Sequence, residues 1–243
     1  MQPKVYKNAF NTIGGVMIES KNAAANTVKA VGQIDVNKFV SIYNRGGNKR
    51  VLFFGNSITR HEPNPDLGWY GDWGMAASCK EKDYVHLVVA ELDKKYGKVD
   101  YCIAQGAMWE WEYRRSEEVL EEYYSAVKEF DPHIIVIRIG ENVTAKKHLE
   151  VDVKPYFAIA VDYLVGKSAE KVVITDMFWY SVYNDALKEV CLEKGYSFCH
   201  LTDLEEDERT MALGLFEHKG VAGHPGDFGM QCIADRILEK IFE

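Results

Sequence analysis

The stretch VLFFGNSIT, which runs from Val51 to Thr59, is the part of the sequence that decides the fold. Its apolar half is long enough for a buried parallel strand, and Gly55 permits a tight exit that a bulky residue would hinder. Ser57 then stands at the carboxyl end of the strand, the edge at which open α/β sheets bind ligands. Ser57 is therefore a candidate nucleophile, although a serine after a strand is also a common helix N-cap.

Apolar runs alternate with segments of helical periodicity along the rest of the chain. Strands are predicted, in chain order, at residues 51–54, 99–104, 134–139, 172–176 and 196–200. Helical periodicity is found between and after these runs, at residues 74–96, 116–130, 154–165, 182–194 and 228–242. The alternation predicts right-handed βαβ units, and so an α/β fold with a mainly parallel five-stranded sheet and helices on both faces.

Residues 1–48 do not follow this alternation. Residues 28–43 alternate loosely enough for one or two strands, and the sequence Asn-Arg-Gly-Gly-Asn at 44–48 is typical of a connector. Because the segment is too short to bury a core of its own, we expect an N-terminal extension packed on a main domain of residues 49–243.

The composition of the 243 residues suits one large α/β domain, because 47% of them are hydrophobic. The net charge of -8 argues against a nucleic-acid-binding surface. No apolar stretch is long enough to span a membrane and the first ten residues lack the apolar core of a signal peptide, so a cytoplasmic protein is expected. The cysteines are scattered without C-x-x-C spacing, which indicates neither a disulfide framework nor a zinc site: Cys79, Cys102, Cys191, Cys199 and Cys232.

Three further segments bear on chemistry. Gly106 follows the second predicted strand, where it would present its backbone N–H to a ligand or simply form a turn. Asn142 follows the third strand in Gly-Glu-Asn, where its amide would donate to an oxyanion or cap a helix. His224 precedes the last helix in a loop fixed by Pro225, a place where a histidine is either structural or held at a site.

In this order Ser57, Gly106, Asn142 and His224 resemble the four sequence blocks of the SGNH hydrolases, also called the GDSL esterase and lipase family. The resemblance extends from about residue 50 to the C-terminus. It implies a three-layer α/β/α sandwich of the flavodoxin-like type and hydrolysis of an ester by acyl transfer, with neither a metal nor a cofactor. It also implies that Ser57 is the nucleophile and His224 the base, and that an oxyanion hole is formed by the N–H groups of Ser57 and Gly106 and the Asn142 amide.

The sequence departs from the family at two positions. Asn56 replaces the aspartate before the serine, which should matter little because the nucleophile is kept. Val221 stands where the family has the aspartate of the triad, three residues before the histidine. Some carbohydrate esterases that resemble the family use a serine and histidine dyad whose imidazole is held by backbone carbonyls. Alternatively, Glu217 or Asp227 supplies the carboxylate, although neither has the family's spacing.

Other side chains are candidates for shaping a pocket. Tryptophans cluster after the nucleophile and after the second strand, where their faces would suit sugar rings, acyl chains, a dimer interface or core packing: Trp69, Trp73, Trp109 and Trp111. Nearby polar residues either line the same pocket or are solvated: His61, Glu110 and Glu112. His218 is a weaker alternative base, because it lacks the proline context.

The sequence therefore predicts a serine esterase that acts on a small ester, such as an acetylated carbohydrate. An α/β-hydrolase elbow is less compatible, because Thr59 occupies the second glycine position of G-x-S-x-G. Two alternatives stay open: a non-catalytic carbohydrate-binding relative, which Val221 favours, and an acyltransferase. The expected partner is a small-molecule ester, with no nucleic acid and no membrane, and a homo-oligomer is left open.

Overall fold

The computed structural model describes residues 12–13, 16–17, 36–143 and 151–243. The chain divides into two compact units, Met1–Asp35 and Val36–Glu243. In the first unit, β1 (Thr12–Ile13) and β2 (Val16–Met17) pair in antiparallel fashion. The expected packing of the N-terminal extension on the main domain falls largely on residues outside the described ones. Residues 36–48 of that extension lie in the second unit.

The second unit contains a six-stranded sheet with the order β3-β5-β4-β6-β7-β8. The predicted strands are its five parallel strands: β4 (Arg50–Gly55), β5 (Asp100–Gln105), β6 (Ile134–Arg138), β7 (Lys171–Thr175) and β8 (Ser197–Cys199). The sixth strand, β3 (Val40–Tyr43), pairs antiparallel with β5 at the edge of the sheet. The predicted number of five was one short, because only Val40 of β3 is buried and the strand lacks a strong apolar pattern.

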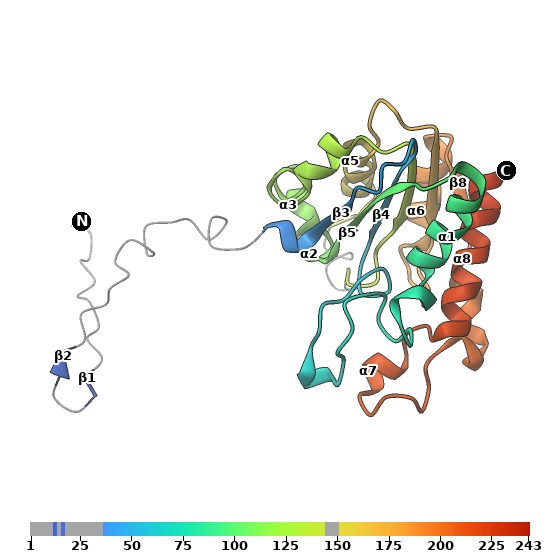
Figure 1. Cartoon of the computed structure of the whole chain (residues 1–243). Coiled ribbons are helices and arrows are strands. Elements are labelled where there is room, and N and C mark those ends of the chain that lie inside the picture. The colour runs from blue at the N-terminus through green and yellow to red at the C-terminus, as the bar shows by residue number, and fades with distance from the viewer. Residues whose placement is uncertain (1–11, 14–15, 18–35, 144–150) are drawn as a thin grey trace, which may run out of the picture. The chain divides into compact units, whose positions relative to one another are not determined.

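The order of the parallel strands is that of flavodoxin-like folds, with the first strand in sequence between the second and the third. Ligands bind such sheets at the carboxyl ends of the strands where the winding direction reverses, here between β4 and β6. In Figure 1 the loop after β4 and the short helix α7 (Lys219–Ala222) both lie below the sheet, at this end. The topology therefore brings the segments after β4 and β6 together with the loop that follows α7.

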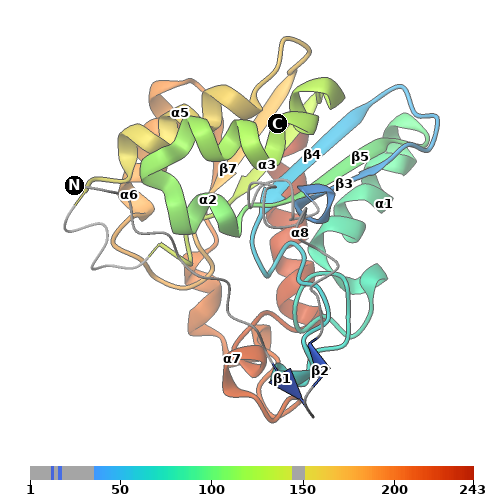
Figure 2. The same cartoon turned by 90° about the vertical axis from the view of Figure 1, so that its left-hand side faces the viewer.

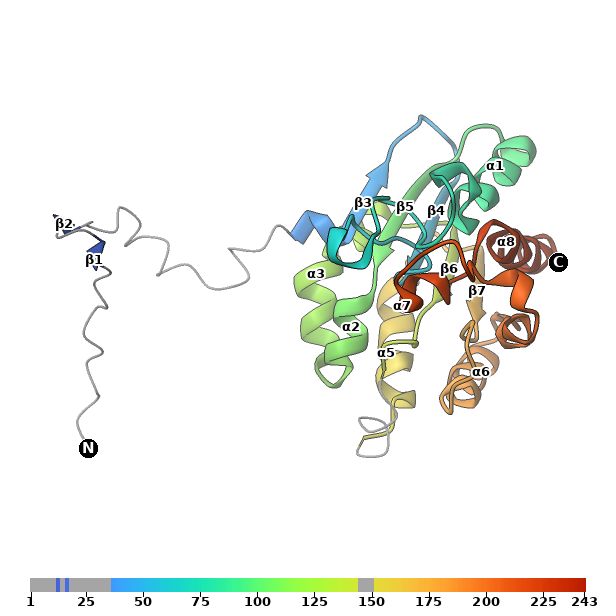
Figure 3. The ribbon, with the colours of Figure 1, turned by 90° about the horizontal axis from the view of Figure 1, so that it is seen from below.

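Helices cover both faces of the sheet, as Figures 2 and 3 show. One face carries α2 (Ala107–Glu112), α3 (Ser116–Phe130), α5 (Lys154–Leu164) and α6 (Asn184–Glu193). The other face carries α1 (Tyr84–Tyr96) and α8 (Asp227–Phe242). Successive residues of a strand point to opposite faces of the sheet. Phe54 is therefore buried under the helices of the first face, and Phe53 is buried under α1 and α8. The predicted three-layer α/β/α sandwich is confirmed.

Four of the predicted helices match α3, α5, α6 and α8 within about two residues. The helix predicted at 74–96 begins only at Tyr84, because Asp83 is its N-cap and accepts a hydrogen bond from the His86 N–H at 2.8 Å. Short turns of 3-10 helix complete the unit, at Val36–Phe39, Pro65–Leu67, Lys80–Lys82, Tyr113–Arg115, Thr202–Glu206 and Glu208–Thr210. Among the described residues, no helix is both long and apolar enough to cross a membrane.

Candidate active site

Ser57 lies in a tight turn directly after β4. The turn is closed by the N–H groups of Thr59 and Arg60, which both donate to the Asn56 carbonyl, at 2.9 and 3.0 Å. Gly55 is required for a steric reason, since a Cβ atom there would lie 1.9 Å from the Thr59 hydroxyl and 2.8 Å from the Arg138 carbonyl. The backbone of the turn thus delivers Ser57 to the carboxyl edge of the sheet, as predicted.

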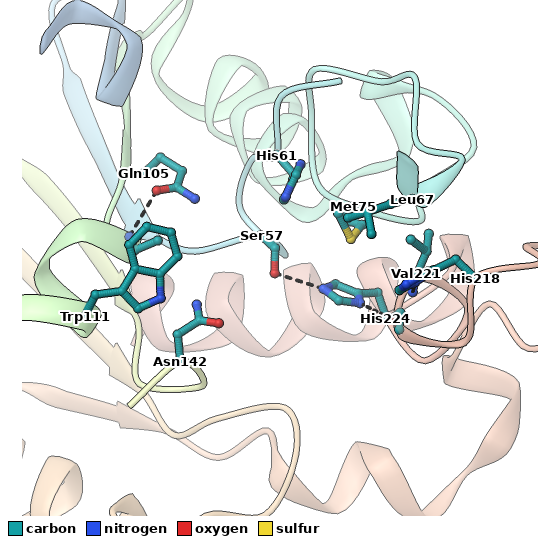
Figure 4. A pocket seen from close by; sticks show the side chains of 12 residues that line it. Ser57, His61, Leu67, Met75, Gln105, Trp111, Asn142, His218, Val221 and His224 are labelled. Carbon is teal, nitrogen blue, oxygen red and sulfur yellow. Dashed lines mark hydrogen bonds between the residues drawn. The ribbon is translucent and has the colours of Figure 1, made fainter. Parts of the chain in front are cut away.

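His224 reaches Ser57 from the loop between α7 and α8. The Ser57 Oγ and the His224 Nε2 are 2.9 Å apart, and the His224 Nδ1 lies 2.7 Å from the Gly220 carbonyl oxygen (Figure 4). A carbonyl only accepts hydrogen bonds, so the Nδ1 carries the proton and the Nε2 presents its lone pair to the serine hydroxyl. This is the arrangement that a general base needs to activate a hydroxyl nucleophile.

The imidazole of His224 is partly buried. The Trp179 ring meets it edge to face, with the ring centres 5.1 Å apart. Burial lowers the pKa of His224 from 6.5 to about 4, while the bond to Gly220 acts in the opposite direction. The histidine is therefore neutral at pH 7, with the lone pair of its Nε2 available. The sequence did not single out Trp179.

Neither alternative carboxylate contacts His224. Asp227 instead accepts hydrogen bonds from the N–H and the hydroxyl of Ser78, both at 2.8 Å, and from the Lys82 ammonium at 3.2 Å. Glu217 is exposed, and the one Nδ1 proton of His224 goes to Gly220. The Gly220 carbonyl thus holds the imidazole, and the role of Ser57 and His224 as a catalytic dyad stays a prediction.

Val221 and His218 lie near Ser57 and His224, and both have contacts that stabilise the surrounding structure. Val221 is fully buried in a small apolar cluster with Trp69 and Met75. The His218 Nδ1 accepts a hydrogen bond from the Val221 N–H at 3.4 Å and so caps the start of α7. His218 lines the pocket, but Ser57 is bonded to His224 and not to it.

The predicted oxyanion donors differ in whether an N–H group is left free for a ligand. Asn142 lines the pocket, and its Nδ2 donates to the Glu110 Oε2 at 2.5 Å. Since an amide nitrogen carries two protons, one N–H of Asn142 remains for a ligand. The Gly106 N–H donates to the Gly55 carbonyl at 2.5 Å and is therefore not free, so the structure disagrees with the role predicted for it. Gly106 is explained by packing, because a Cβ there would lie 2.5 Å from the Ile139 side chain.

A buried polar cluster joins β6 to the segments after β4, β5 and β6. Asn56, Glu110 and Arg138 are buried, and the partly buried Glu141 and Asn142 complete the cluster. The Asn56 amide donates to the Glu110 Oε1 at 3.0 Å and to the Glu141 Oε2 at 2.6 Å. Its carbonyl oxygen accepts from the Arg138 guanidinium at 2.7 Å. An aspartate at position 56 would have no proton for either carboxylate, which explains the departure from the family pattern.

Glu110 occupies the centre of this cluster. Its side chain is fully buried and accepts hydrogen bonds from the N–H groups of Gly140 and Asn142, at 2.6 and 3.3 Å, besides those from the two amides. Burial raises the pKa of Glu110, and the neighbouring Glu141 carboxylate adds to the rise.

Gly140 has a φ of 138°, a conformation that L-residues rarely adopt, so a glycine is needed where the chain leaves β6.

Ser57 and His224 line a pocket of about 230 Å³. Polar and apolar residues together line the pocket: Ser57, His61, Leu67, Met75, Gln105, Ala107, Trp111, Asn142, His218, Gly220, Val221 and His224 (Figure 4). His61, which was a candidate for shaping the pocket, is among these residues. Glu110 is not, because it is buried beneath them.

Of the four predicted substrate-binding tryptophans, only Trp111 lines the pocket, and 51% of its surface is exposed. Trp109 is buried in the core and its Nε1 donates to the Ser116 hydroxyl at 2.7 Å. Trp69 is also buried and donates to the His61 carbonyl, while Trp73 packs against it and donates to the Ala77 carbonyl. For these three the core-packing interpretation is the correct one.

Within residues 36–143 and 151–243, no group of three or more histidine, cysteine or acidic side chains is arranged to hold a metal ion. The five cysteines form no disulfide.

In comparisons with known proteins, no family model and no curated protein matches the sequence. Solved structures do match. A two-domain esterase active on acetylated mannans, co-crystallised with mannopentaose, has a TM-score of 0.52 at 16% identity over 80% of this chain and 49% of that one. A putative GDSL-like lipase from Parabacteroides merdae has a TM-score of 0.50 at 18% identity over 80% of this chain and 95% of that one. The same score, at 15% identity and with the same coverage, is found for LAE5, an alpha/beta hydrolase enzyme from the metagenome of Lake Arreo, Spain. The chain therefore has an SGNH/GDSL hydrolase-like fold, and identities this low establish the fold alone.

Proposed function

We propose that this protein is a serine esterase that hydrolyses small esters through an acyl-enzyme. The observation that carries the proposal is the chain of contacts from the Ser57 hydroxyl to the His224 Nε2, at 2.9 Å, and from the His224 Nδ1 to the Gly220 carbonyl, at 2.7 Å. A serine and an oriented neutral imidazole at the mouth of a pocket are the minimum that nucleophilic acyl transfer requires.

In the proposed reaction the Ser57 Oγ attacks the ester carbonyl while the His224 Nε2 takes the hydroxyl proton. The tetrahedral oxyanion is stabilised by the Ser57 N–H and the free N–H of Asn142. The imidazolium then returns its proton to the leaving alcohol, which leaves the acyl group on Ser57. Water repeats the sequence with the same base and releases the acid. The Gly220 carbonyl accepts a hydrogen bond from Nδ1 throughout, and so stabilises the imidazolium.

The pocket favours a short acyl group. Its volume of about 230 Å³ lies below the roughly 300 Å³ at which sites for drug-sized ligands begin. Trp111 adds a half-exposed aromatic ring at the rim, and such a ring suits the apolar face of a sugar. We therefore propose an acetylated carbohydrate as the substrate class. That an esterase active on acetylated mannans shares the fold supports this choice at the level of the fold.

Hydrolysis of p-nitrophenyl acetate by the purified protein tests the proposal. Ser57→Ala should remove the activity and leave the melting temperature nearly unchanged. Ser125→Ala is the matched control, because Ser125 is an exposed serine on α3, and it should keep full activity. A fluorophosphonate probe should label Ser57. Full activity in Ser57→Ala, or a label on another serine, would rule the assignment out. Faster acyl transfer to an added sugar than to water would identify an acyltransferase instead.

A further inference from the structure

The mechanism above assigns no role to Glu110, although this residue is a fully buried carboxylate next to the pocket. Glutamate is almost never completely buried unless its oxygens have partners. Here they have four N–H donors. The Oε1 accepts from the Asn56 Nδ2 at 3.0 Å and from the N–H groups of Gly140 and Asn142 at 2.6 and 3.3 Å, and the Oε2 accepts from the Asn142 Nδ2 at 2.5 Å.

Two of these four donors belong to Asn142, and a third belongs to the turn that carries it. The contacts to the N–H groups of Gly140 and Asn142 fix the backbone of the turn. The contact to the Asn142 Nδ2 fixes the rotation of the amide. An amide turned by 180° would place its carbonyl oxygen against the carboxylate, where two acceptors would meet without a proton. Glu110 therefore selects one of the two amide orientations.

We propose that Glu110 is a positioning residue, which holds the Asn142 amide so that an N–H and not the carbonyl oxygen meets the oxyanion. This inference rests on the proposed esterase function. Its physical basis is that an oxyanion donor is effective only if its orientation is fixed before the reaction, since no energy is then spent on turning it. Asn142 stands in a loop after β6, and Glu110, from the helix after β5, supplies the rigid support that such a loop lacks.

A double-mutant cycle between the two residues tests the proposal, with p-nitrophenyl acetate as the substrate. In Glu110→Gln one oxygen is replaced by a donor, so the Asn142 amide loses the preference for its orientation. We expect kcat to fall about tenfold or more with KM nearly unchanged, because the lost contact acts in the transition state. In an Asn142→Ala background the same change should cost less than about threefold, because the amide that Glu110 orients is already gone.

Ser116→Ala is the matched control. The Ser116 hydroxyl is buried, accepts from Trp109 of α2 at 2.7 Å and donates to the Tyr156 carbonyl at 3.2 Å, so the change loosens the same helix without touching Asn142. It should lower the melting temperature, and any effect on kcat should be equal in both backgrounds. If Glu110→Gln does not fold, Glu110→Asp keeps the charge but shortens the reach to Asn142 and serves in the same cycle.

An equal loss of kcat for Glu110→Gln with and without Asn142 would overturn the inference, as would an unchanged kcat in the single variant. The proposed function fails separately, since it depends on Ser57→Ala being inactive. If Ser57→Ala is inactive while Glu110→Gln behaves as the parent protein, only the inference about Glu110 is wrong.

Discussion

On one side of Ser57 stands His224, whose imidazole is held by a single backbone carbonyl and packed against the Trp179 ring. On the other side stands Asn142, whose amide is bonded to Glu110 in a cluster that holds two carboxylates and one guanidinium. Among the described residues, the imidazole thus has no carboxylate as a hydrogen-bond partner, whereas the cluster around the amide contains two carboxylates. A carboxylate beside the imidazole would raise the pKa of His224, whereas burial lowers it to about 4.

The comparison indicates that the His224 imidazole and the Asn142 amide are oriented in two different ways, the first by a backbone carbonyl and the second by a carboxylate. A backbone carbonyl cannot lose or gain charge, so the orientation of His224 does not depend on pH as long as the Nδ1 is protonated. The orientation of Asn142 depends on a carboxylate that remains an acceptor. The first side should therefore be insensitive to substitution of nearby acids, and the second side should be sensitive.

The largest effect is expected at His224. His224→Ala removes the group that accepts the Ser57 proton, so kcat/KM should fall by about three orders of magnitude or more. The measurement is the steady-state hydrolysis of an acetyl ester. His218→Ala is the matched control, since His218 lines the same pocket without bonding to Ser57, and it should change kcat/KM by less than about threefold. A larger loss in the control than in His224→Ala would assign the base to His218.

The next effect concerns the amide side. Asn142→Ala should lower kcat by about a hundredfold with a modest change in KM, since removal of one oxyanion donor costs on the order of 2.7 to 4 kcal/mol in the transition state. A change confined to KM would mean that Asn142 binds the ground state of the substrate instead.

The sequence predicted more of the base side than of the amide side. Ser57 and His224 stand next to strong local signals, a strand exit and a proline-fixed turn, and they do meet at 2.9 Å. Glu110 carries no such signal, because a glutamate in a helix is usually solvated and nothing local shows that it is buried. The bond between the Gly106 N–H and the Gly55 carbonyl arises where two neighbouring strands end, so it depends on their register, which the sequence does not reveal.

The wrong predictions for the buried tryptophans and for the number of strands have a similar explanation. Trp109 lies one position from Glu110 and two from the half-exposed Trp111, and only the rotation of α2 separates the buried from the exposed ring. The edge strand β3 shows little apolar pattern because it is buried at one residue only. In both cases tertiary contacts, and not local sequence, determine the outcome.

The buried polar cluster predicts a stability effect at position 56. Asn56→Asp replaces two N–H donors by an acceptor between Glu110 and Glu141, so the free energy of unfolding at pH 7 should fall by about 1–3 kcal/mol. Denaturant unfolding measures this loss. Asn184→Asp is the control, because the Asn184 amide donates to the Thr202 hydroxyl and not to a carboxylate, and it should cost less. An equal loss in the two variants would contradict the interpretation.

The pKa of His224 predicts the pH dependence of the base side. Its value in the folded protein is about 4, below the usual 6.5, so the unfolded chain binds more protons between these values. The contribution of His224 to stability is therefore complete above pH 6.5 and is lost as the pH falls from 6.5 to about 4. The acid limb of kcat/KM should lie near pH 4. The free energies of unfolding of the parent protein and of His224→Ala should therefore converge as the pH falls from 6.5 to about 4. If the two free energies stayed a constant distance apart, burial would not lower the pKa of His224.

The smallest effect is expected from the two carboxylates that were alternatives for the third member of a triad. Glu217→Ala and Asp227→Ala should each change kcat/KM by less than about twofold, because the His224 Nδ1 donates to Gly220 and leaves no proton for either. Asp227→Ala should still lower the melting temperature, since Asp227 joins the start of α8 to Ser78 and Lys82. The melting temperature and kcat/KM together separate a structural role from a catalytic one. A lower melting temperature with unchanged kcat/KM would show that Asp227 only holds the start of α8 in place. A collapse of kcat by several orders of magnitude in either variant would instead reveal a triad acid, as wrong-tautomer substitutions do in serine proteases, and the contrast between the two sides of Ser57 would disappear.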